Sequence, residues 1–380
     1  MTRYRIAAIG GDGVGPDVVR EARRVLGAVA ARDGFELEWL ELLAGGAAID
    51  AYGVALRPED LEAAGEGHAV LLGAVGGPQW DDPDAKVRPE QALFALRGGL
   101  ELFANLRPVT VHPALVPSSP LRPELLAGVD LLIVRELTSG VYFGRPSEGR
   151  STPGGRVAVD TVWYTEAEIE RVVRLAFELA RWRRRRITSV DKANVLATSW
   201  LWRKVVEEVR ADFADVEVGH QLVDSCAMLL IREPAWFDVL VTENMFGDIL
   251  SDEAAVLAGS LGMLPSASLG DRRTEHGRFG LYEPIHGSAP TLAGRDVANP
   301  LGTILSAAML LRWSLGREDA AAAVEAAVAT AVDAGYRTAD LVGPGDAPAG
   351  IRQVGTRGMA DAVVAALGAP ATQALAGGAR

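Results

Sequence analysis

The chain has 380 residues, of which 49% are hydrophobic and 23% are charged, so it can fill a sizeable core and is not a disordered chain. Its formal net charge of −12 argues against nucleic acid or an anionic membrane as the main partner, and it means that an anionic substrate needs a local cluster of arginines. The single cysteine, Cys226, excludes an internal disulfide and fits a reducing cytoplasm.

The length indicates two domains of ordinary size. We expect no signal peptide, because the glycines that begin at Gly10 interrupt the short apolar run at the N-terminus. No apolar run reaches about 18 residues, so we expect no transmembrane helix.

The chain begins with a predicted strand at residues 4–9, a glycine-rich turn at 10–16 and a helix at 17–32. The glycines do not match the dinucleotide fingerprint G-x-G-x-x-G, because Pro16 stands at its last position. Two interpretations remain open: the turn lets a ligand approach the backbone, or it is purely structural.

Further strands are predicted at 37–43 and 69–73, with a helix at 58–64 between them. This alternation predicts an α/β fold with a doubly wound sheet. Ligands gather at the carboxyl ends of such strands, and the glycine-rich segment 73–78 follows one of them.

Residues 88–97 have a helical pattern that places Glu90, Leu93, Phe94 and Arg97 on one face. An acid, two apolar groups and a base on one face suit the wall of a pocket that receives a carboxylate and an alkyl group. The alternative is a surface helix with an ion pair between Glu90 and Arg97.

Arg107 and Arg135 follow, and with Arg97 they are predicted at the ends of elements. Arg135 ends an apolar strand, where an ionised group must be paired or face a cleft. Because guanidinium binds carboxylate in a bidentate way, the three arginines form a candidate carboxylate clamp.

Residues 136–156 are rich in Gly, Ser and Pro and contain Tyr142, which is typical of a projecting arm. An amphipathic helix is predicted at 164–182. Four arginines, 183–186, end it, where cations favour the helix dipole. Binding of nucleic acid through this run is the weaker alternative.

Lysine is rare here, since Lys86, Lys192 and Lys204 are the only ones. Lysine can lose its proton near neutral pH in a suitable site, whereas arginine effectively cannot. Lys192 follows a short predicted strand and therefore lies where a cleft is expected. Asp224 ends another predicted strand, and Cys226, in a helix at 225–231, is expected to be a buried filler.

A buried strand at 237–241 leads into the stretch 241–253, where a helical pattern is predicted after Gly247. Asp248 and Asp252 are four residues apart, so their carboxylates share one helix face. A divalent cation such as Mg²⁺ or Mn²⁺ would offset their repulsion. The alternative is that these acids simply occupy the first helical turn, where the dipole favours them.

In the last third of the chain, residues 271–280 are predicted to be a surface loop. The turn at His286–Ala289 offers a ring and free backbone N–H groups, which an adenine and a pyrophosphate need, although a turn histidine is more often structural. Helices are predicted at 301–315, 319–334 and 358–367, and a disordered end after Pro370.

Five blocks in order carry a resemblance that extends over nearly the whole chain. The chain resembles the isocitrate/isopropylmalate family of β-decarboxylating dehydrogenases, and within it the members that act on 3-isopropylmalate. The blocks are residues 102–108 (LFANLRP), 134–144 (VRELTSGVYFG), 190–195 (VDKANV), 244–252 (NMFGDILSD) and 286–290 (HGSAP).

The resemblance implies a two-domain fold that is not a classical Rossmann domain. Residues 1–102 and 259–380 would form the cofactor-binding domain. Residues 103–258 would bind substrate and metal and mediate dimerisation, with an arm at about 139–160. The protein would be a homodimer with shared active sites, to which the partner supplies Lys192 and Asp224.

The resemblance also implies metal-dependent oxidative decarboxylation of (2R,3S)-3-isopropylmalate to 4-methyl-2-oxopentanoate with reduction of NAD, a step of leucine biosynthesis. Lys192 would take the hydroxyl proton and Tyr142 would help to protonate the enol. The implied binding residues are Arg97, Arg107, Arg135, Glu90, Leu93 and Phe94 for substrate, Asp224, Asp248 and Asp252 for Mg²⁺ or Mn²⁺, and His286, Gly287, Ser288, Ala289, Thr291 and Asn299 for the cofactor.

Two positions depart from the family pattern. Thr291 stands where NAD-using members carry an Asp that binds the ribose and repels a 2′-phosphate, so NADP is an alternative to the expected NAD. Phe94 stands where a Leu usually touches the isopropyl group, which leaves open another 3-substituted malate or tartrate. A non-catalytic regulatory subunit is disfavoured, because Lys192, Tyr142 and the three aspartates are all present.

Overall fold

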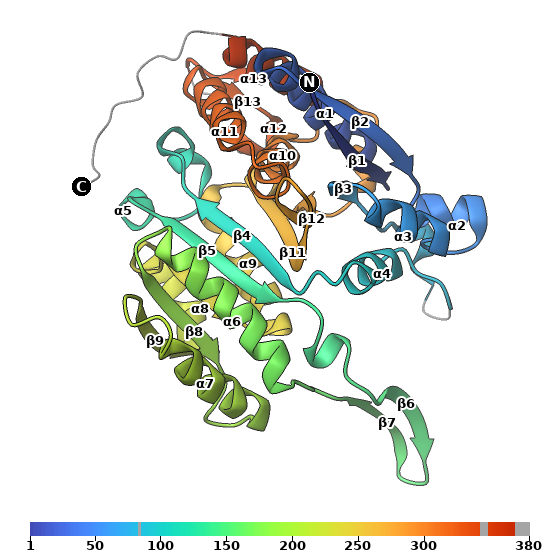
Figure 1. Cartoon of the computed structure of the whole chain (residues 1–380), viewed down its shortest axis with the longest axis vertical. Helices are drawn as coiled ribbons and strands as arrows, with labels where there is room; N and C mark the ends of the chain where they lie inside the picture. Colours follow the sequence, from blue (N-terminus) through green and yellow to red (C-terminus); the bar gives the residue numbers. More distant parts are fainter. Residues whose placement is uncertain (83–84, 343–348, 369–380) are drawn as a thin grey trace.

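The computed structural model describes residues 1–82, 85–342 and 349–368 (Figure 1). Its centre is one 10-stranded sheet in the order β2-β1-β3-β12-β11-β4-β5-β10-β8-β9, with helices on both of its faces. The predicted α/β class is confirmed. Strands from the two ends of the chain form one half of this sheet, and strands from its middle form the other.

The half built from the two ends of the chain comprises β1 Thr2–Gly11, β2 Phe35–Leu42, β3 Ala69–Ala74, β11 Pro265–Arg273 and β12 Arg278–Pro284. The half built from the middle comprises β4 Ala104–Thr110, β5 Asp130–Glu136, β8 Arg186–Asp191, β9 Glu217–Leu222 and β10 Val239–Thr242. The two halves join where β11 pairs with β4.

The main predicted helices are confirmed to within a few residues at each end, whereas α2, α5, α7 and α12 were not foreseen. The helices are α1 Gly15–Asp33, α2 Gly46–Tyr52, α3 Pro58–Gly65, α4 Gln91–Gly99, α5 Pro123–Leu126, α6 Glu166–Arg181, α7 Ala197–Arg210, α8 Val223–Arg232, α9 Asn244–Ala255, α10 Leu301–Trp313, α11 Glu318–Asp333, α12 Ala339–Val342 and α13 Thr356–Gly368. The short strands β13 Tyr336–Arg337 and β14 Arg352–Gln353 also pair near the end of the chain.

The sheet is mixed, a feature that the predicted doubly wound arrangement did not specify. Its outer strands are parallel, but β4 runs antiparallel to both β5 and β11, and β11 runs antiparallel to β12. The predicted surface loop at 271–280 is shorter than expected, because β11 continues to Arg273, β12 begins at Arg278, and only residues 274–277 connect them. The charged ends of β11 and β12 continue as a hairpin, where Arg272 stacks over the ring of Phe279 at 4.3 Å.

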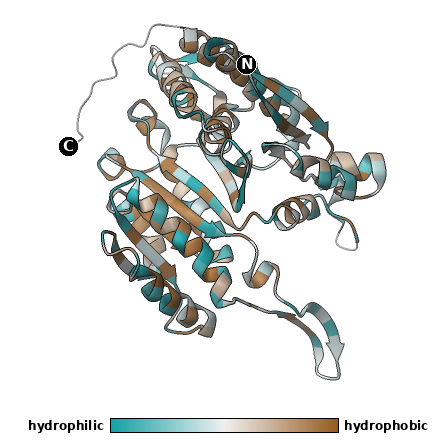
Figure 2. Cartoon of the chain, in the orientation of Figure 1, coloured by the Kyte–Doolittle hydropathy of each residue, from teal (hydrophilic) through white to brown (hydrophobic). Residues whose placement is uncertain are grey.

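Burial follows the hydropathy of the strands (Figure 2). The central strand β10 is buried at every position, because neighbours β5 and β8 flank it and helices cover its faces. Helix α6 is amphipathic and begins with a capping box, in which Thr165 and Glu168 satisfy each other's backbone N–H. Cys226 is buried in α8, as expected.

A hairpin formed by β6 Ser147–Thr152 and β7 Gly155–Asp160 projects from the body of the molecule (Figure 1). All of its strand residues are exposed except Thr152, which is half-buried. A two-stranded hairpin with no covered face has little to stabilise it in isolation. The predicted excursion is therefore present, and it is more regular than the sequence indicated.

Three of the four arginines after α6 bind other parts of the molecule, the third being Arg186, which donates to the carbonyl oxygen of Trp236. Arg183 pairs with Asp130 and Asp238, each at 2.8 Å, and Arg184 donates to the carbonyl oxygens of Asp130 and Phe237. Because these guanidinium groups tie the end of α6 to neighbouring strands, the run is not a free basic surface, and the nucleic-acid alternative loses its basis.

The predicted disordered end after Pro370 lies outside the described residues. Within the described ranges, none of the helices combines the length and the hydropathy that a bilayer crossing requires.

Candidate active site

Helix α9 carries the aspartates that the sequence singled out. It starts at Asn244, four residues before the predicted start, because Glu243 Oε1 accepts the N–H of Phe246 at 2.7 Å and caps the helix. Asp248 therefore lies beyond the first turn, which contains no acid. The interpretation of Asp248 and Asp252 as simple first-turn acids is wrong, and their position on one face needs another explanation.

Arg135 lies across the start of this helix. Its side chain is 3% exposed, and its Nε and Nη2 donate to Asn244 Oδ1 at 3.0 and 2.9 Å, while Nη1 donates to Asp248. A β-carbon at Gly247 would come within 2.6 Å of Arg135 Cγ, so glycine makes room for the arginine. The expectation that Arg135 must be paired is confirmed.

Arg107 lies in the middle of β4, which corrects its expected place at the end of an element. The antiparallel pairing of β4 with β5 brings it beside Arg135 all the same. Its Nε donates to Asn105 Oδ1 at 2.7 Å, and its Nη1 donates to Ser251 and, at 3.4 Å, to Asp252. Its Nη2 lies 3.7 Å from Asp248.

Tyr142 completes this group from the short 3₁₀ turn η3, Gly140–Tyr142. Its hydroxyl donates to Asp248 Oδ2 at 3.0 Å, and its ring lies 5.9 Å from Arg135 Cζ. Burial and the neighbouring Asp248 carboxylate raise the pKa of Tyr142 to about 12. The phenol therefore keeps its proton at neutral pH and can act as a proton donor.

Burial shifts the pKa values of several side chains in this group. Burial, with Arg135 as a like-charged neighbour, lowers the pKa of Arg107 to about 10, and burial also lowers the pKa of Arg135. Burial raises the pKa of Asp252. Two buried guanidinium groups facing two carboxylates and a phenol make a site suited to an anionic ligand and a cation together.

Arg97 comes to this site from the last turn of helix α4. Its Nη2 donates to Glu283 Oε1 at 2.9 Å, and its Nε is buried with no partner in the described part of the chain. The alternative ion pair between Glu90 and Arg97 is not formed, because Arg97 pairs with Glu283 instead. Phe94 is 41% exposed and packs edge-to-face on Phe143 at 5.5 Å, and Leu93 beside it is half-buried.

Lys192 and Asp224 form a separate pair, in which Lys192 Nζ donates to Asp224 Oδ1 at 2.7 Å. This hydrogen bond holds the pKa of Asp224 below its usual range. Asp224 lies in the first turn of α8, two residues after β9 ends. Within one chain, two of the three predicted metal ligands, Asp248 and Asp252, lie together on α9, whereas the third, Asp224, is bound to Lys192.

Among the described residues, only His68, Glu275 and His276 bring three metal-ligand atoms within 4.8 Å of one another. His68 Nδ1 accepts the N–H of Arg5 at 2.9 Å, which leaves the ring proton on Nε2, 3.2 Å from Glu275 Oε1. A protonated nitrogen cannot bind a metal, so we assign this cluster a structural role.

The glycine-rich turn near the N-terminus has a structural role, and the approach of a ligand to its backbone stays a prediction. Gly11 and Gly13 have positive φ, and β-carbons there would lie 2.0 Å from the carbonyl oxygens of Ala74 and Ser288. Asp12 accepts the N–H groups of Gly46, Ala47 and Gly76, each at 2.8 Å.

The turn at His286–Ala289 contacts the N-terminal glycine-rich turn, because Val14 N donates to Ser288 O at 2.8 Å. His286 Nδ1 lies 2.9 Å from the carbonyl of Gly287, which leaves Nε2 as an acceptor, and Nε2 is buried with no partner in the described part of the chain. Burial lowers the pKa of His286.

The remaining predicted cofactor residues differ in exposure. Thr291 and Gly287 are exposed, whereas Ser288 is buried. Asn299 has structural partners, since its Oδ1 accepts the N–H of Leu301 at 3.0 Å and its Nδ2 donates to Asp340 at 3.0 Å. Its side-chain amide is therefore engaged at the start of α10.

Three residues that hold this group together, Asn244, Ser251 and Glu283, were not singled out from the sequence. Asn244 is the second residue after the buried strand β10 ends at Thr242, and Glu283 is the last residue but one of β12. The position of a polar residue at a strand's carboxyl end was the available signal. Ser251 gave no comparable signal, because a serine within a helix is common on any face.

Comparisons with known proteins agree with this geometry. A family model described as isocitrate/isopropylmalate dehydrogenase matches residues 5–363. The 3-isopropylmalate dehydrogenase of Anaeromyxobacter dehalogenans is 56% identical over 361 residues, which cover 95% of this chain and 98% of that protein. The protein of the same name from Moorella thermoacetica is 56% identical over 353 residues, or 93% and 97% of the two chains.

Among solved structures, the isocitrate dehydrogenase of Methylococcus capsulatus superimposes with a TM-score of 0.82 at 33% sequence identity. The match covers 96% of this chain and 99% of that one.

Proposed function

The chain belongs to the isocitrate/isopropylmalate dehydrogenase family, and we propose that it catalyses the oxidative decarboxylation of 3-isopropylmalate with reduction of NAD, a step of leucine biosynthesis. The observation that carries the proposal is the contact group of Arg107, Arg135, Tyr142, Asp248 and Asp252. It combines carboxylate binding, cation binding and a protonated phenol, which are the three requirements of this reaction.

The arginines bind and orient the substrate. Arg107 and Arg135 present buried guanidinium groups, and Arg97 has a buried Nε without a partner in the described ranges. In a site of low polarity such donors bind carboxylate strongly, and their fixed geometry orients the malate backbone. Phe94 and Leu93, on the same helix as Arg97, would contact the alkyl group at C3.

The donor set fits a Mg²⁺ or Mn²⁺ ion. Asp248 and Asp252 offer carboxylate oxygens from one helix face, and both lie within 4 Å of Arg107. Asp224 from a second subunit would complete the set. When bound, the ion supplies Lewis-acid stabilisation of negative charge on the substrate oxygens.

The chemistry then needs two proton transfers. Lys192 would take the proton of the 2-hydroxyl, and the nicotinamide, when bound, would supply the acceptor for hydride from C2, so that a 2-oxo acid is formed. The carboxylate on C3 would leave as carbon dioxide, and its bonding electrons would form the enolate. Tyr142, whose proton is retained at neutral pH, would protonate C3 as the enolate becomes the ketone.

Lys192 and Asp224 reach this group from a second subunit. Within one chain Asp224 is bonded to Lys192 and does not join Asp248 and Asp252. We therefore propose an obligate homodimer in which each site takes Lys192 and Asp224 from the partner, with the hairpin β6–β7 as the dimerisation arm. The cofactor-binding domain is proposed as 1–102 plus 259–380, and 103–258 as the second domain.

The cofactor is bound by the turn at His286–Ala289. The unpartnered Nε2 of His286 would accept a hydrogen bond from the adenine amine, and the N–H groups of the turn would face the pyrophosphate. Thr291 is exposed and keeps a short acceptor for the ribose. NAD is the proposed cofactor, and NADP is the alternative because Thr291 carries no charge to repel a 2′-phosphate.

A second candidate, the same reaction on another 3-substituted malate, rests on the contact of Phe94 with Phe143, which places two aromatic rings beside the proposed alkyl pocket. Initial rates with Mn²⁺ on 3-isopropylmalate, other 3-substituted malates and tartrate, each with NAD and with NADP, separate the candidates. We expect 3-isopropylmalate with NAD to exceed every other pair by about tenfold in kcat/KM. A higher rate with another acid transfers the proposal to that acid, and no turnover on the panel overturns it.

A further inference from the structure

The role of Arg135 depends on where its guanidinium group points, and Asn244 fixes that direction. Asn244 Oδ1 accepts from Nε at 3.0 Å and from Nη2 at 2.9 Å, so one edge of the guanidinium is fully engaged. The opposite nitrogen, Nη1, donates to Asp248. A buried arginine held on one edge in this way can present its remaining donors in only one direction.

Asn244 is itself held through its other polar groups. Its Nδ2 donates to the carbonyl of Ser139 at 2.9 Å, and its backbone N–H donates to the hydroxyl of Tyr164 at 2.9 Å. The guanidinium of Arg135 and the carbonyl of Ser139 determine the orientation of the side-chain amide, with its oxygen toward Arg135 and its nitrogen toward Ser139. Asn244 is 1% exposed, so water cannot replace them easily.

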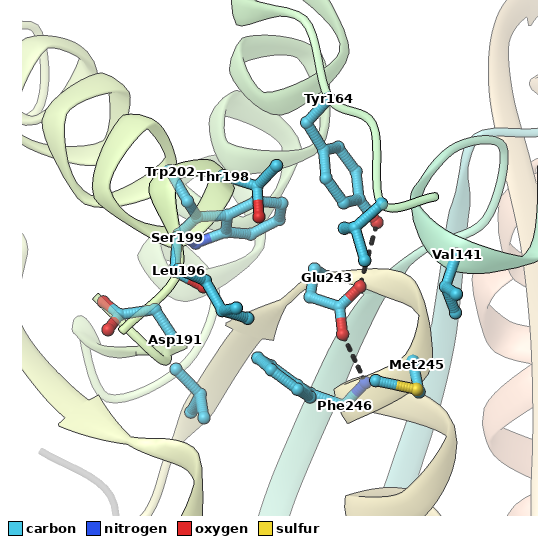
Figure 3. Close-up of a pocket in the computed structure, with 12 residues that line it drawn as sticks. Val141, Tyr164, Asp191, Leu196, Thr198, Ser199, Trp202, Glu243, Met245 and Phe246 are labelled. Carbon is cyan, nitrogen blue, oxygen red and sulfur yellow. Dashed lines mark hydrogen bonds between the residues drawn. The ribbon is translucent and has the colours of Figure 1, made fainter. Parts of the chain in front are cut away.

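Tyr164 anchors this arrangement from the start of helix α6. Its hydroxyl lies 3.3 Å from Glu243 Oε2 and 3.4 Å from Glu136 Oε2, and it is buried. Figure 3 shows the hydroxyl directed toward Glu243, at the edge of a pocket that Trp202 and Val141 also line. The side chain of Glu243 in turn caps α9.

Asn244 also connects the two groups that contact Asp248. Ser139, which it binds through Nδ2, immediately precedes the turn that carries Tyr142. Arg135, which it binds through Oδ1, is the other partner of Asp248. One amide therefore bridges the strand that supplies the carboxylate-binding arginine and the turn that supplies the proton donor.

We propose that Asn244, held by Tyr164, is a positioning residue that sets the geometry of Arg135 through Oδ1 and of Tyr142 through Nδ2. This inference rests on the proposed function. Neither Asn244 nor Tyr164 would touch the substrate, and both act through residues that do.

The first test is Asn244→Ala, compared with the unaltered protein in KM for the malate and KM for the nicotinamide cofactor. We expect KM for the malate to rise about tenfold or more and KM for the cofactor to stay unchanged, because the Arg135 guanidinium loses two hydrogen bonds while the cofactor turn is untouched. General loss of structure would lower the active fraction without this split.

Asn244→Asp separates the two functions of the amide. A carboxylate accepts from Arg135 as well as the amide does, but it cannot donate to Ser139 O. We expect KM for the malate to return to within about threefold of the original while kcat falls about tenfold through displacement of Tyr142. A KM as high in this variant as in Asn244→Ala overturns the assignment to Oδ1.

Tyr164→Phe keeps the ring and removes only the hydroxyl. It therefore tests the positioning role of Asn244 even if Asn244→Ala does not fold. We expect KM for the malate to rise about threefold. A matched control is Thr242→Val, which removes a buried hydrogen bond to Val190 O two residues before Asn244 without contacting Arg135. Unchanged KM for the malate in the folded Asn244 and Tyr164 variants overturns the proposal, whereas absence of turnover in the unaltered protein overturns only the proposed function.

Discussion

The side chain of Arg135 is buried, charged and bonded on both edges, and these properties depend on one another. A buried guanidinium is costly unless it is paired, and here Asn244 and Asp248 supply the partners. Gly247 gives it the space, since any side chain there would collide with it. The same burial that makes the arginine costly also makes its remaining donors effective toward a carboxylate.

At the scale of single residues, we predict that Phe94 sets the substrate preference for the group on C3. Replacing it by alanine removes the ring that contacts Phe143 and opens the proposed alkyl pocket. We expect Phe94→Ala to lower the ratio of kcat/KM for 3-isopropylmalate to that for malate by about tenfold or more, because the alkyl group loses its apolar contact.

The control for this change is Gly98→Ala in the same helix, where the added carbon meets no atom within 4 Å. That variant should leave the ratio unchanged. An unchanged ratio in Phe94→Ala as well would show that the alkyl group binds elsewhere.

The reactivity of the Cys226 thiol reports whether this side chain is buried. Burial raises the pKa of its thiol to about 12, so at pH 8 only about one thiol in 10⁴ is ionised, and the thiolate is the reactive form. We expect an aromatic disulfide reagent at pH 8 to leave the native protein unmodified and to titrate one thiol after denaturation in urea. Rapid labelling of the native protein would contradict the burial of Cys226.

At the scale of elements, helix α1 contains two glycines with opposite requirements. Gly27 lies in the helix interior, where an added carbon meets nothing within 4 Å, whereas at Gly15 it would lie 2.2 Å from Gly10 O and 2.7 Å from Ala74 N. We expect Gly27→Ala to raise the free energy of unfolding by about 0.5–1 kcal/mol. Gly15→Ala should lower it by about 2 kcal/mol or more, because backbone atoms must move.

Urea unfolding of both variants at one protein concentration measures these changes, and a common concentration is needed because the proposed dimer would contribute to apparent stability. Effects of the same sign in both variants would mean that the packing of the glycine-rich turn against β3 is not what requires Gly15.

At the scale of the whole molecule, the proposal of shared sites makes a sharp prediction. Lys192→Met and Asp248→Asn should each abolish turnover, because each removes a group that the proposed site needs. If Lys192 serves the partner's site, a mixed dimer contains one Lys192→Met subunit and one Asp248→Asn subunit. One of its two sites then carries both substitutions, and the other site carries neither. Random mixing should then restore about a quarter of the original activity.

The control is a mixture of Asp248→Asn with Asp252→Asn, which alters two residues of the same helix. No intact site can form in that mixture, so activity should not return. Failure of the first mixture to regain activity, although mixed dimers are detected by mass, would show that each subunit holds a complete site.

Much of the fold follows from local sequence. The periodicity of α1 and α6 and the apolar run of β10 each satisfy the pattern of one element and bury the same residues in the structure. The pairing of Arg135 also followed from one rule, that an ionised group at the end of a buried strand needs a partner. The family followed from five short blocks, which need no spatial model to be compared.

Other features were decided by the tertiary structure alone. The direction of β4 and β11 depends on neighbours far away in sequence, so alternation of strands and helices could not indicate the antiparallel centre of the sheet or the hairpin at 271–280. The helix start at Asn244, which overturned the first-turn interpretation of the aspartates, depended on a cap from Glu243.

Asn244 shows the difference most clearly. Its chain neighbours identify it as a polar residue at the start of a helix and no more. Its role comes from Arg135, Ser139 and Tyr164, which are 80 to 109 positions distant in the chain and meet only after the sheet and α6 have packed. Local sequence determines which elements form because their hydrogen bonds and periodicity are local, whereas a site depends on side-chain directions that only long-range packing fixes.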